Sequence, residues 1–254
     1  MVKIITWNVN SIKMRLERAK RLLENEKPDI LCLQELKCVD DAFPKDFEAL
    51  GYTATVFGQK TYNGVAILSK TQPSHIQRGI TSSDPDSRLV SVQIGNLIAY
   101  SAYIPNGQAV GSDKYVYKLS WLEKLESLLK SRHTSDEYVV VTGDFNVAPE
   151  DKDVHDPIQW KDQILCSVDE RKAFQKVIAL GYTDCFRKLH PDSNEYSWWD
   201  YRNLGFPMNN GLRIDFLLAN QKLAEKCVSS TILREERKGE KPSDHAPVCA
   251  EFDI

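Results

Sequence analysis

The sequence predicts an α/β fold in which parallel and antiparallel strands are mixed. A strand, a helix and a second strand follow one another over residues 2–33, and this order is typical of a parallel pair joined by a crossover helix. Short strand patterns separated by turn signals then occupy residues 52–103, and they indicate an antiparallel section. The β-branched run at residues 139–142 predicts a central strand that is buried on both faces.

The N-terminal part of the chain is predicted to form the parallel pair. Residues 2–7 are rich in β-branched and aromatic side chains, which favour a strand. Ser11 is expected to cap a helix whose apolar residues recur at helical spacing until Pro28 ends it. Residues 30–33 form the second strand, so both strands should end at the same edge of the sheet.

The middle of the chain is predicted to be antiparallel, with Asn63-Gly64 and Gly95-Asn96 as turns. Its strands are expected at residues 52–57, 65–69, 88–94 and 97–103. Helices are predicted over residues 113–130 and 168–180, and the last strands over residues 212–218, 228–233 and 248–252. The sequence contains no repeat, low-complexity tract or linker, which predicts a single domain of residues 1–254.

Composition indicates an ordinary globular protein. Hydrophobic residues make up 42% of the 254 residues and charged residues 27%, so a sizeable core can be buried. The net charge of −3 does not favour a nucleic-acid binder, although a local basic face or a bound cation can serve an acidic protein. The six cysteines are scattered without a C-x-x-C pair and are expected to be reduced core residues.

The N-terminus leads directly into a predicted strand, without a hydrophobic signal segment. No apolar run approaches the roughly 20 residues that a membrane-spanning helix needs. These features predict a cytoplasmic protein without a membrane partner, and a monomer is expected.

Two polar residues follow the predicted central strand. Gly143 breaks the strand and lets the backbone approach a neighbour closely, and Asp144 and Asn146 come next, two positions apart. A carboxylate at the end of a buried strand is costly unless it is paired, bound to metal or catalytic. Asp144 and Asn146 could equally close a turn, as such residues often do.

Asp215 and His245 are the most informative of the other polar residues. Asp215 lies between apolar neighbours in a predicted strand, so its carboxylate needs a partner or a task. A buried salt bridge, with Arg213 as the cation, is one explanation. The other is that Asp215 holds one nitrogen of His245 and directs the second nitrogen at a substrate, because the adjacent Asp244 should point away from His245.

The carboxylates of Glu35, Asp144 and Asp244, together with nearby carboxamides, form a set of oxygen ligands. Hard oxygen ligands favour Mg²⁺ or Mn²⁺ over zinc. Because Mg²⁺ usually keeps waters for phosphate oxygens, a phosphate ester is the expected substrate. The sequence has no P-loop motif and no marked serine or cysteine nucleophile, so water is the expected attacking group.

Seven short motifs together resemble those of the exonuclease III family, which comprises bacterial exodeoxyribonuclease III and apurinic/apyrimidinic endonucleases. They occur in the family order and span nearly the whole chain. The motifs are W-N-V-N (7–10), L-Q-E (33–35), Y-I-P-N-G (103–107), G-D-F-N (143–146), W-W-D-Y-R (198–202), G-L-R-I-D (211–215) and S-D-H-A-P (243–247). The tryptophan-rich and L-R-I-D motifs indicate the DNA-repair branch of the endonuclease/exonuclease/phosphatase superfamily.

The resemblance implies a four-layered α/β sandwich, with two mixed β-sheets packed face to face and helices on the outside. It also implies a Mg²⁺-dependent phosphodiesterase of base excision repair, for which Mn²⁺ is a substitute. The substrate would be double-stranded DNA with an abasic site or a 3′ end. Incision at abasic sites and 3′ to 5′ exonuclease trimming are the two activities it implies.

The resemblance further assigns roles to individual residues. Glu35 would bind the metal with Asn8 and Asn10 beside it, and Asp244 would lie near a second metal position. The catalytic residues it implies are Asp144 and Asn146 for the attacking water, His245 and its partner Asp215 for the developing charge, and Tyr103 for the scissile phosphate. The substrate-binding residues it implies are Asn106 at the phosphate, Trp198, Leu212 and Ile214 around an apolar sugar pocket, and Arg202 at the DNA.

Three departures from other members leave the balance of activities open. In the animal branch, an aspartate often stands at the position of Asn10 and a pocket tryptophan stands at the position of Leu212. Some members carry a basic residue where this chain has Gln108 and Ala109. Solvated surface charge is the alternative for each basic residue that could meet DNA. These basic residues are Lys37, Arg88, Lys114, Lys118, Arg202 and Lys241.

Two other functions remain as alternatives. A superfamily phosphatase or phosphodiesterase acting on inositol phosphates or phospholipids would share the metal site but not the W-W-D-Y-R and L-R-I-D context. A catalytically inactive DNA-binding module would require a lost catalytic residue. None of Glu35, Asp144, Asp215, Asp244 and His245 is missing.

Overall fold

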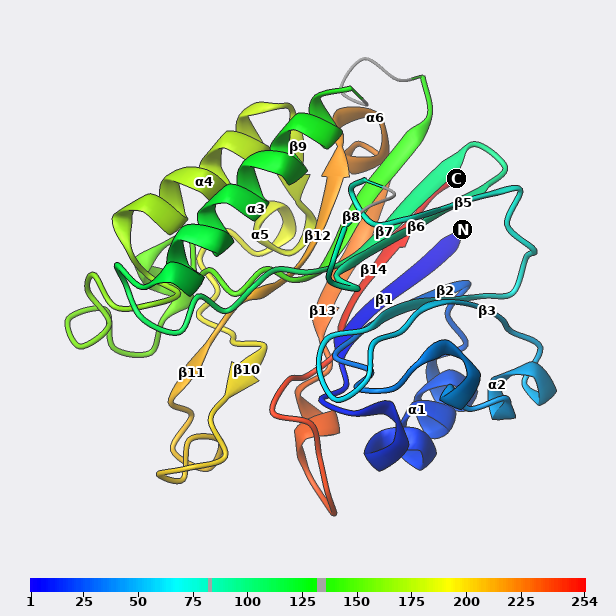
Figure 1. The fold of residues 1–254 in the computed structure, drawn as a ribbon, viewed down its shortest axis with the longest axis horizontal. Coiled ribbons are helices and arrows are strands. Elements are labelled where there is room, and N and C mark those ends of the chain that lie inside the picture. The colour runs from blue at the N-terminus through cyan, green and yellow to red at the C-terminus, as the bar shows by residue number, and fades with distance from the viewer. Residues whose placement is uncertain (82–83, 132–135) are drawn as a thin grey trace.

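The computed structural model describes residues 1–81, 84–131 and 136–254 and contains two six-stranded sheets (Figure 1). The first sheet has the order β13-β14-β1-β2-β4-β3, and the second has the order β5-β6-β7-β8-β12-β9. The strands of the first are β1 (Val2–Asn8), β2 (Ile30–Gln34), β3 (Thr53–Phe57), β4 (Val65–Ser69), β13 (Cys227–Ile232) and β14 (Val248–Phe252). Those of the second are β5 (His75–Arg78), β6 (Leu89–Ile94), β7 (Leu97–Tyr103), β8 (Tyr138–Asp144), β9 (Tyr182–Asp184) and β12 (Asp215–Asn220).

Helices cover the outer face of each sheet, so the molecule has four layers (Figure 1). Helices α1 (Ile12–Glu26) and α2 (Asp46–Ala49) pack on the first sheet, and α3 (Asp113–Lys130) and α4 (Val168–Ala179) pack on the second. A third apolar cluster fills the space between the sheets. Short helices α5 (Cys185–Leu189) and α6 (Gln221–Ala224), together with β5 and β9, were not expected from the sequence. The predicted four-layered α/β sandwich is confirmed.

Both sheets mix parallel and antiparallel pairs. Strand β1 pairs in parallel with β2 and antiparallel with β14, and β7 pairs in parallel with β8. The predicted antiparallel section is divided between the two sheets, because β3 and β4 join β2 whereas β6 and β7 join β8. Gly95-Asn96 is the tight turn expected between β6 and β7.

Two local predictions were wrong. Ser11 makes no side-chain cap, since the start of α1 is held by backbone bonds from Ser11 and Ile12 to the carbonyl oxygens of Glu35 and Leu36. The strand predicted over residues 212–218 is interrupted, because β11 (Gly211–Leu212) pairs with β10 (Trp198–Trp199) and β12 begins only at Asp215. The hydroxyl of Ser197 accepts hydrogen bonds from the backbone amides of Ile214 and Asp215 at this break.

The close backbone approach expected at Gly143 is present. Gly143 has φ +135°, and a Cβ atom there would lie 1.9 Å from the carbonyl oxygen of Ala102 on the parallel neighbour β7. No side chain can be accommodated at that distance without moving one strand. Gly143 therefore allows β7 and β8 to remain paired up to the residues that end them, Tyr103 and Asp144.

Substitution of Gly143 by alanine should destabilise the fold by about 3 kcal/mol or more, since it combines a steric overlap with a strained φ. Chemical denaturation would measure the free energy of unfolding. Gly95→Ala is a suitable control, because Gly95 also has positive φ but no atom lies within 4 Å of the added Cβ. Gly95→Ala should lower the free energy of unfolding by about 1 kcal/mol. Equal losses of stability in the two variants would contradict this account.

All six cysteines are buried free thiols, as predicted. Within the described ranges, no helix has the length and apolar character that crossing a membrane requires.

Candidate active site

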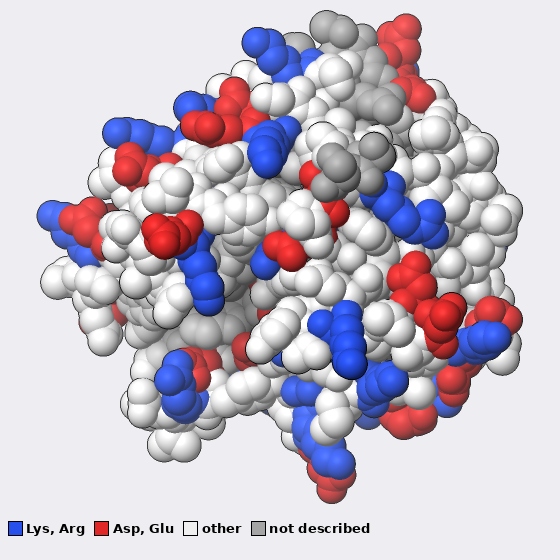
Figure 2. Space-filling view, viewed as in Figure 1, with Lys and Arg blue, Asp and Glu red and all other residues white. Residues whose placement is uncertain are grey.

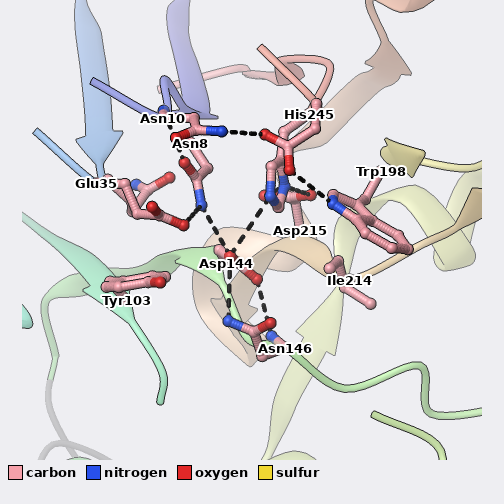
Figure 3. Close-up of polar contacts among 12 residues, drawn as sticks. Asn8, Asn10, Glu35, Tyr103, Asp144, Asn146, Trp198, Ile214, Asp215 and His245 are labelled. Atoms are coloured by element: carbon pink, nitrogen blue, oxygen red, sulfur yellow. Dashed lines mark hydrogen bonds and ion pairs between the residues drawn. The ribbon is translucent and has the colours of Figure 1, made fainter. Parts of the chain in front are cut away.

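The site lies where the central strands of both sheets end. Asn8 ends β1 and Glu35 follows β2 in the first sheet, whereas Tyr103 ends β7 and Asp144 ends β8 in the second. Figure 3 shows that these side chains converge from the two sheets, and His245 approaches them from the loop before β14. The sequence predicted the shared edge within each sheet but not that the two edges meet.

Asp144 is at the centre of the hydrogen-bond network and is almost completely buried. Its Oδ2 accepts hydrogen bonds from Asn8 Nδ2 at 2.9 Å and Asn146 Nδ2 at 3.2 Å, and its Oδ1 accepts one from the backbone amide of Asn146 at 2.9 Å. Asn8 Nδ2 also donates to Glu35 Oε1 at 3.0 Å. The turn predicted as the alternative role of Asp144 and Asn146 is therefore present. The same conformation directs the Asp144 carboxylate toward that of Glu35.

Asp215 orients His245. The Nδ1 atom of His245 lies 2.9 Å from Asp215 Oδ2, and its Nε2 atom lies 3.7 Å from Asp144 Oδ2. Ser197 Oγ donates to Asp215 Oδ2 at 2.6 Å and so fixes that carboxylate in turn. Nothing in the sequence distinguishes Ser197 from an ordinary loop serine.

A salt bridge between Asp215 and Arg213, the other explanation offered by the sequence, does not form. Arg213 is buried and faces the opposite way, with Nε 2.7 Å from Asp153 Oδ1 and Nη1 2.6 Å from Asp184 Oδ2. Its guanidinium satisfies two carboxylates behind the site. Asp215 therefore bonds His245 and Ser197 instead of Arg213.

The environment shifts the pKa of two central groups upward. Burial raises the pKa of Asp144 to about 7, and the nearby carboxylates of Asp215 and Glu35 add to this effect. Burial acts to lower the pKa of His245, but the carboxylates of Asp215 and Asp144 outweigh it and raise the pKa to about 10. Near neutral pH His245 is therefore an imidazolium, and Asp144 is able to accept a proton.

A reaction in which Asp144 accepts a proton should slow as the pH falls through the pKa of Asp144, because protonation occupies the accepting oxygen. The slope should approach about tenfold per pH unit. A cation beside Glu35 favours the carboxylate form, so the midpoint should move below about 7 as metal saturates the site. A pH profile of kcat at several metal concentrations measures this shift. A rate that is independent of pH on the acid side would remove Asp144 as the titrating group.

Three groups are close enough to share an ion. Single ligand atoms of Glu35, Asp144 and His245 lie within 4.8 Å of one another. Since Asp215 holds His245 as an imidazolium, the two carboxylates are the better ligands for a hard cation. Asn8 turns its Nδ2 toward both carboxylates, and its Oδ1 accepts a hydrogen bond from the backbone amide of Asn10 at 3.0 Å. Carboxylate oxygens fit a hard divalent cation such as Mg²⁺ or Mn²⁺.

Asp244 is bonded to Asn10 and Trp198, two residues that are labelled in Figure 3. Its Oδ1 accepts a hydrogen bond from Asn10 Nδ2 at 2.9 Å and its Oδ2 accepts one from Trp198 Nε1 at 3.0 Å. Lys37 Nζ lies 3.0 Å from Glu35 Oε2 and 2.5 Å from Asn10 Oδ1. The ammonium of Lys37 therefore lies between Glu35 and Asn10, the residue that bonds Asp244.

The other predicted substrate-binding residues divide into two groups. Asn106 Nδ2 donates to Asn146 Oδ1 at 3.1 Å, and Trp198 packs on the buried side chains of Leu212 and Ile214. Trp199 is fully buried whereas Trp198 is partly exposed, as their alternation predicted. Arg202 lies on the surface and is paired with Asp200 at 2.7 Å, so the structure does not bring it into the site.

Comparison with known proteins identifies the family. The model of the endonuclease/exonuclease/phosphatase family matches residues 5–245. The chain belongs to that family. Exodeoxyribonuclease III of Haemophilus influenzae is 36% identical over 99% of this chain and 100% of its own length. An exodeoxyribonuclease of Bacillus subtilis is 31% identical over 97% of this chain and 98% of its own length.

Solved structures of the endonuclease/exonuclease/phosphatase family agree with this fold over the whole chain. The Neisseria 3′ phosphatase NExo, bound to a product DNA hairpin, is 40% identical with a TM-score of 0.97, and each chain is covered completely. An AP endonuclease from Archaeoglobus fulgidus is 41% identical with a TM-score of 0.95, again with complete coverage of both chains. The resemblance to the exonuclease III enzymes and the expected class, a DNA-repair phosphodiesterase, are confirmed.

Proposed function

We propose that this chain hydrolyses phosphodiester bonds of double-stranded DNA with a water molecule and a bound Mg²⁺ ion, for which Mn²⁺ can substitute. The observation that carries the proposal is the position of Asp144 between Glu35 and the Asp215–His245 pair. One side of Asp144 offers carboxylate oxygens to a cation, and the other side offers an imidazolium to an anion. A phosphate ester bound between them meets both.

Glu35 would hold the ion with the amide of Asn8 beside it, and Asp244 is the further carboxylate proposed for a second position. A bound Mg²⁺ supplies charge stabilisation to phosphate oxygens and acidifies its water ligands. Asp144 orients the attacking water and takes its proton, for which a pKa raised to about 7 suits it. The imidazolium of His245 donates from Nε2 to the phosphoryl oxygen as charge develops there.

The remaining residues position the phosphate. Asn146 and Asn106 present linked carboxamides beside Asp144, and Tyr103 lies at the end of the neighbouring strand. Burial raises the pKa of the Tyr103 hydroxyl well above its usual value, and Glu35 and Asp144 add to the shift. Tyr103 therefore keeps its proton and can donate a hydrogen bond to a phosphate oxygen.

Trp198, with Leu212 and Ile214 beneath it, is proposed to receive the sugar of an abasic site or of a 3′ terminal nucleotide. The names of the similar proteins, a 3′ phosphatase and an AP endonuclease at nearly equal identity, support both substrates. Figure 2 shows Lys and Arg side chains interspersed with Asp and Glu over the face drawn. A groove between α1 and the loop before β14 is lined by Lys13, Arg21, Lys238 and Lys241 as well as by Glu17 and Glu240. We propose that its basic residues meet DNA phosphates, with Arg202 on the adjoining loop.

Because both sheets contribute to one site, we propose that residues 1–254 act as one domain. A DNA substrate and six free thiols favour the cytoplasm as the place of action. A monomeric enzyme stays a prediction.

Two labelled duplexes test the proposal, one with an internal abasic site and one with a nick that bears a blocked 3′ end. Purified protein would be incubated with each in Mg²⁺ or in EDTA. Mg²⁺-dependent incision at the abasic site means that the Trp198 pocket admits an internal sugar, whereas removal of the 3′ block alone means a 3′-end enzyme. Inertness on both duplexes, with phosphate release from inositol phosphates, would overturn the DNA assignment.

A further inference from the structure

From the sequence, Lys118 was one of six basic residues that could either meet DNA phosphates or form solvated surface charge, and the structure shows that it does neither. Lys118 lies on α3 and its side chain is completely buried. Its Nζ donates hydrogen bonds to the backbone carbonyl oxygens of Asn106 at 3.1 Å and Asn146 at 2.6 Å, and it forms an ion pair with Glu170. An ammonium has three N–H donors, so these partners satisfy it fully and none remains for a phosphate.

Glu170 is itself fixed from several directions. Its carboxylate accepts hydrogen bonds from the backbone amides of Leu165 and Ser167 and from the hydroxyl of Ser167. The bond from the Ser167 amide and the reciprocal bond from the Glu170 amide to Ser167 Oγ form the capping box at the start of α4. Lys118 is therefore anchored between α3 and α4, and its ammonium group is held at a fixed point beneath the loops that carry Asn106 and Asn146.

The loop that carries Asn146 has an uncommon backbone conformation. Asn146 has φ +51°, a left-handed conformation that is costly for most residues, although asparagine tolerates it better than most. Such a conformation persists only when its surroundings hold it in place. The Asn146 side chain meanwhile donates to Asp144 Oδ2 at 3.2 Å and accepts from Asn106 Nδ2 at 3.1 Å. A shift of its backbone would move both amides relative to Asp144.

We propose that Lys118 is a positioning residue, which fixes the carboxamides of Asn106 and Asn146 against Asp144 by binding the two backbone carbonyls from inside the protein. This inference rests on the proposed function, in which those carboxamides hold the phosphate and the water. Burying a charged pair costs free energy that an apolar pair would not. A positioning role for the Lys118 ammonium, beyond neutralising Glu170, explains why a charged pair is buried at this place.

The test separates positioning from charge pairing. Lys118→Met alone would leave the Glu170 carboxylate buried without a partner and could prevent folding. The double variant Lys118→Met/Glu170→Gln removes both charges together, so it keeps the core neutral while it deletes the bonds to the two carbonyls. Lys124→Met, an exposed lysine of the same helix, is the matched control.

The double variant should keep the thermal transition of a folded protein but lose about 10- to 100-fold in kcat on the duplex that the wild type cleaves, with KM for DNA nearly unchanged. Adding Asn146→Ala to the double variant should lower kcat little further, because Lys118 acts through Asn146. Wild-type kcat in the folded double variant would overturn the proposal. An increased KM with unchanged kcat would also overturn it, since that result would make Lys118 a DNA contact.

A second measurement does not depend on activity. In ¹⁵N-labelled protein, the side-chain amide resonances of Asn106 and Asn146 should shift or broaden in the double variant and stay in place in Lys124→Met. Unchanged resonances would overturn the positioning role even if the wild type cleaved neither duplex. Failure of the wild type to cleave DNA would count against the proposed function alone.

Discussion

Asp144→Ala should abolish turnover, with a loss of at least about 10³-fold in kcat, and should leave DNA binding largely intact. Asp144 is the group that orients and deprotonates the water in the proposed mechanism. Because it is buried and acts as a carboxylate in the proposed mechanism, it repels rather than attracts an anionic ligand. Removal of the carboxylate therefore acts on the chemical step.

Single-turnover cleavage and a fluorescence-anisotropy titration with the same duplex would measure the two effects separately. Asp151→Ala is the matched control, since Asp151 is an exposed acid that pairs with Arg171 outside the site. It should leave both values near those of the wild type. Retained turnover in Asp144→Ala would remove this residue from the mechanism.

His245→Asn should lower kcat by about 10²- to 10⁴-fold. The substitution removes the imidazolium that lies between Asp144 and Asp215 and replaces it with a neutral amide. The loss should appear in kcat rather than in KM, because the donated bond strengthens as charge develops on the phosphate. Asp215→Asn should follow in the same direction, since it lowers the charge that keeps His245 protonated.

His190→Asn serves as the control for this substitution. His190 is a partly buried histidine that bonds the carbonyl oxygen of Ser230 away from the site. Its replacement should leave kcat unchanged while removing a comparable ring. A near-normal rate in His245→Asn would exclude the Asp215–His245 pair from catalysis.

Much of the fold could be predicted from local pattern. Residues 65–69, 97–103 and 113–130 form the predicted elements with the predicted bounds, because turn signals or a leucine stripe mark their ends. The break between β11 and β12 could not be predicted in this way. At this break Arg213 pairs with Asp153 and Asp184, and Ser197 Oγ accepts bonds from the amides of Ile214 and Asp215, and all these partners are distant in the sequence.

The residues of the site also divide into those that could be predicted from the sequence and those that could not. Asp144, Asp215 and His245 were identifiable because charged or polar side chains in apolar strands require partners. Ser197 and Lys118 were not, since a loop serine and a helix lysine look like surface residues until their neighbours are known. The sequence placed Lys118 among solvated cations, and only the packing of α3 on α4 shows that it is enclosed.

The site spans a seam between two layers that share no main-chain ladder. The Asn8–Asp144 bond and the Asp215–His245 bond each run from one sheet to the other. The gap between the layers is set by apolar side chains such as Ile4, whereas its neighbour Ile5 points to the opposite face under α1. The distance between catalytic groups on the two sheets therefore depends on the thickness of the core between them. Loss of a methyl group from this core beneath the site would change that distance, although no reacting atom has been altered.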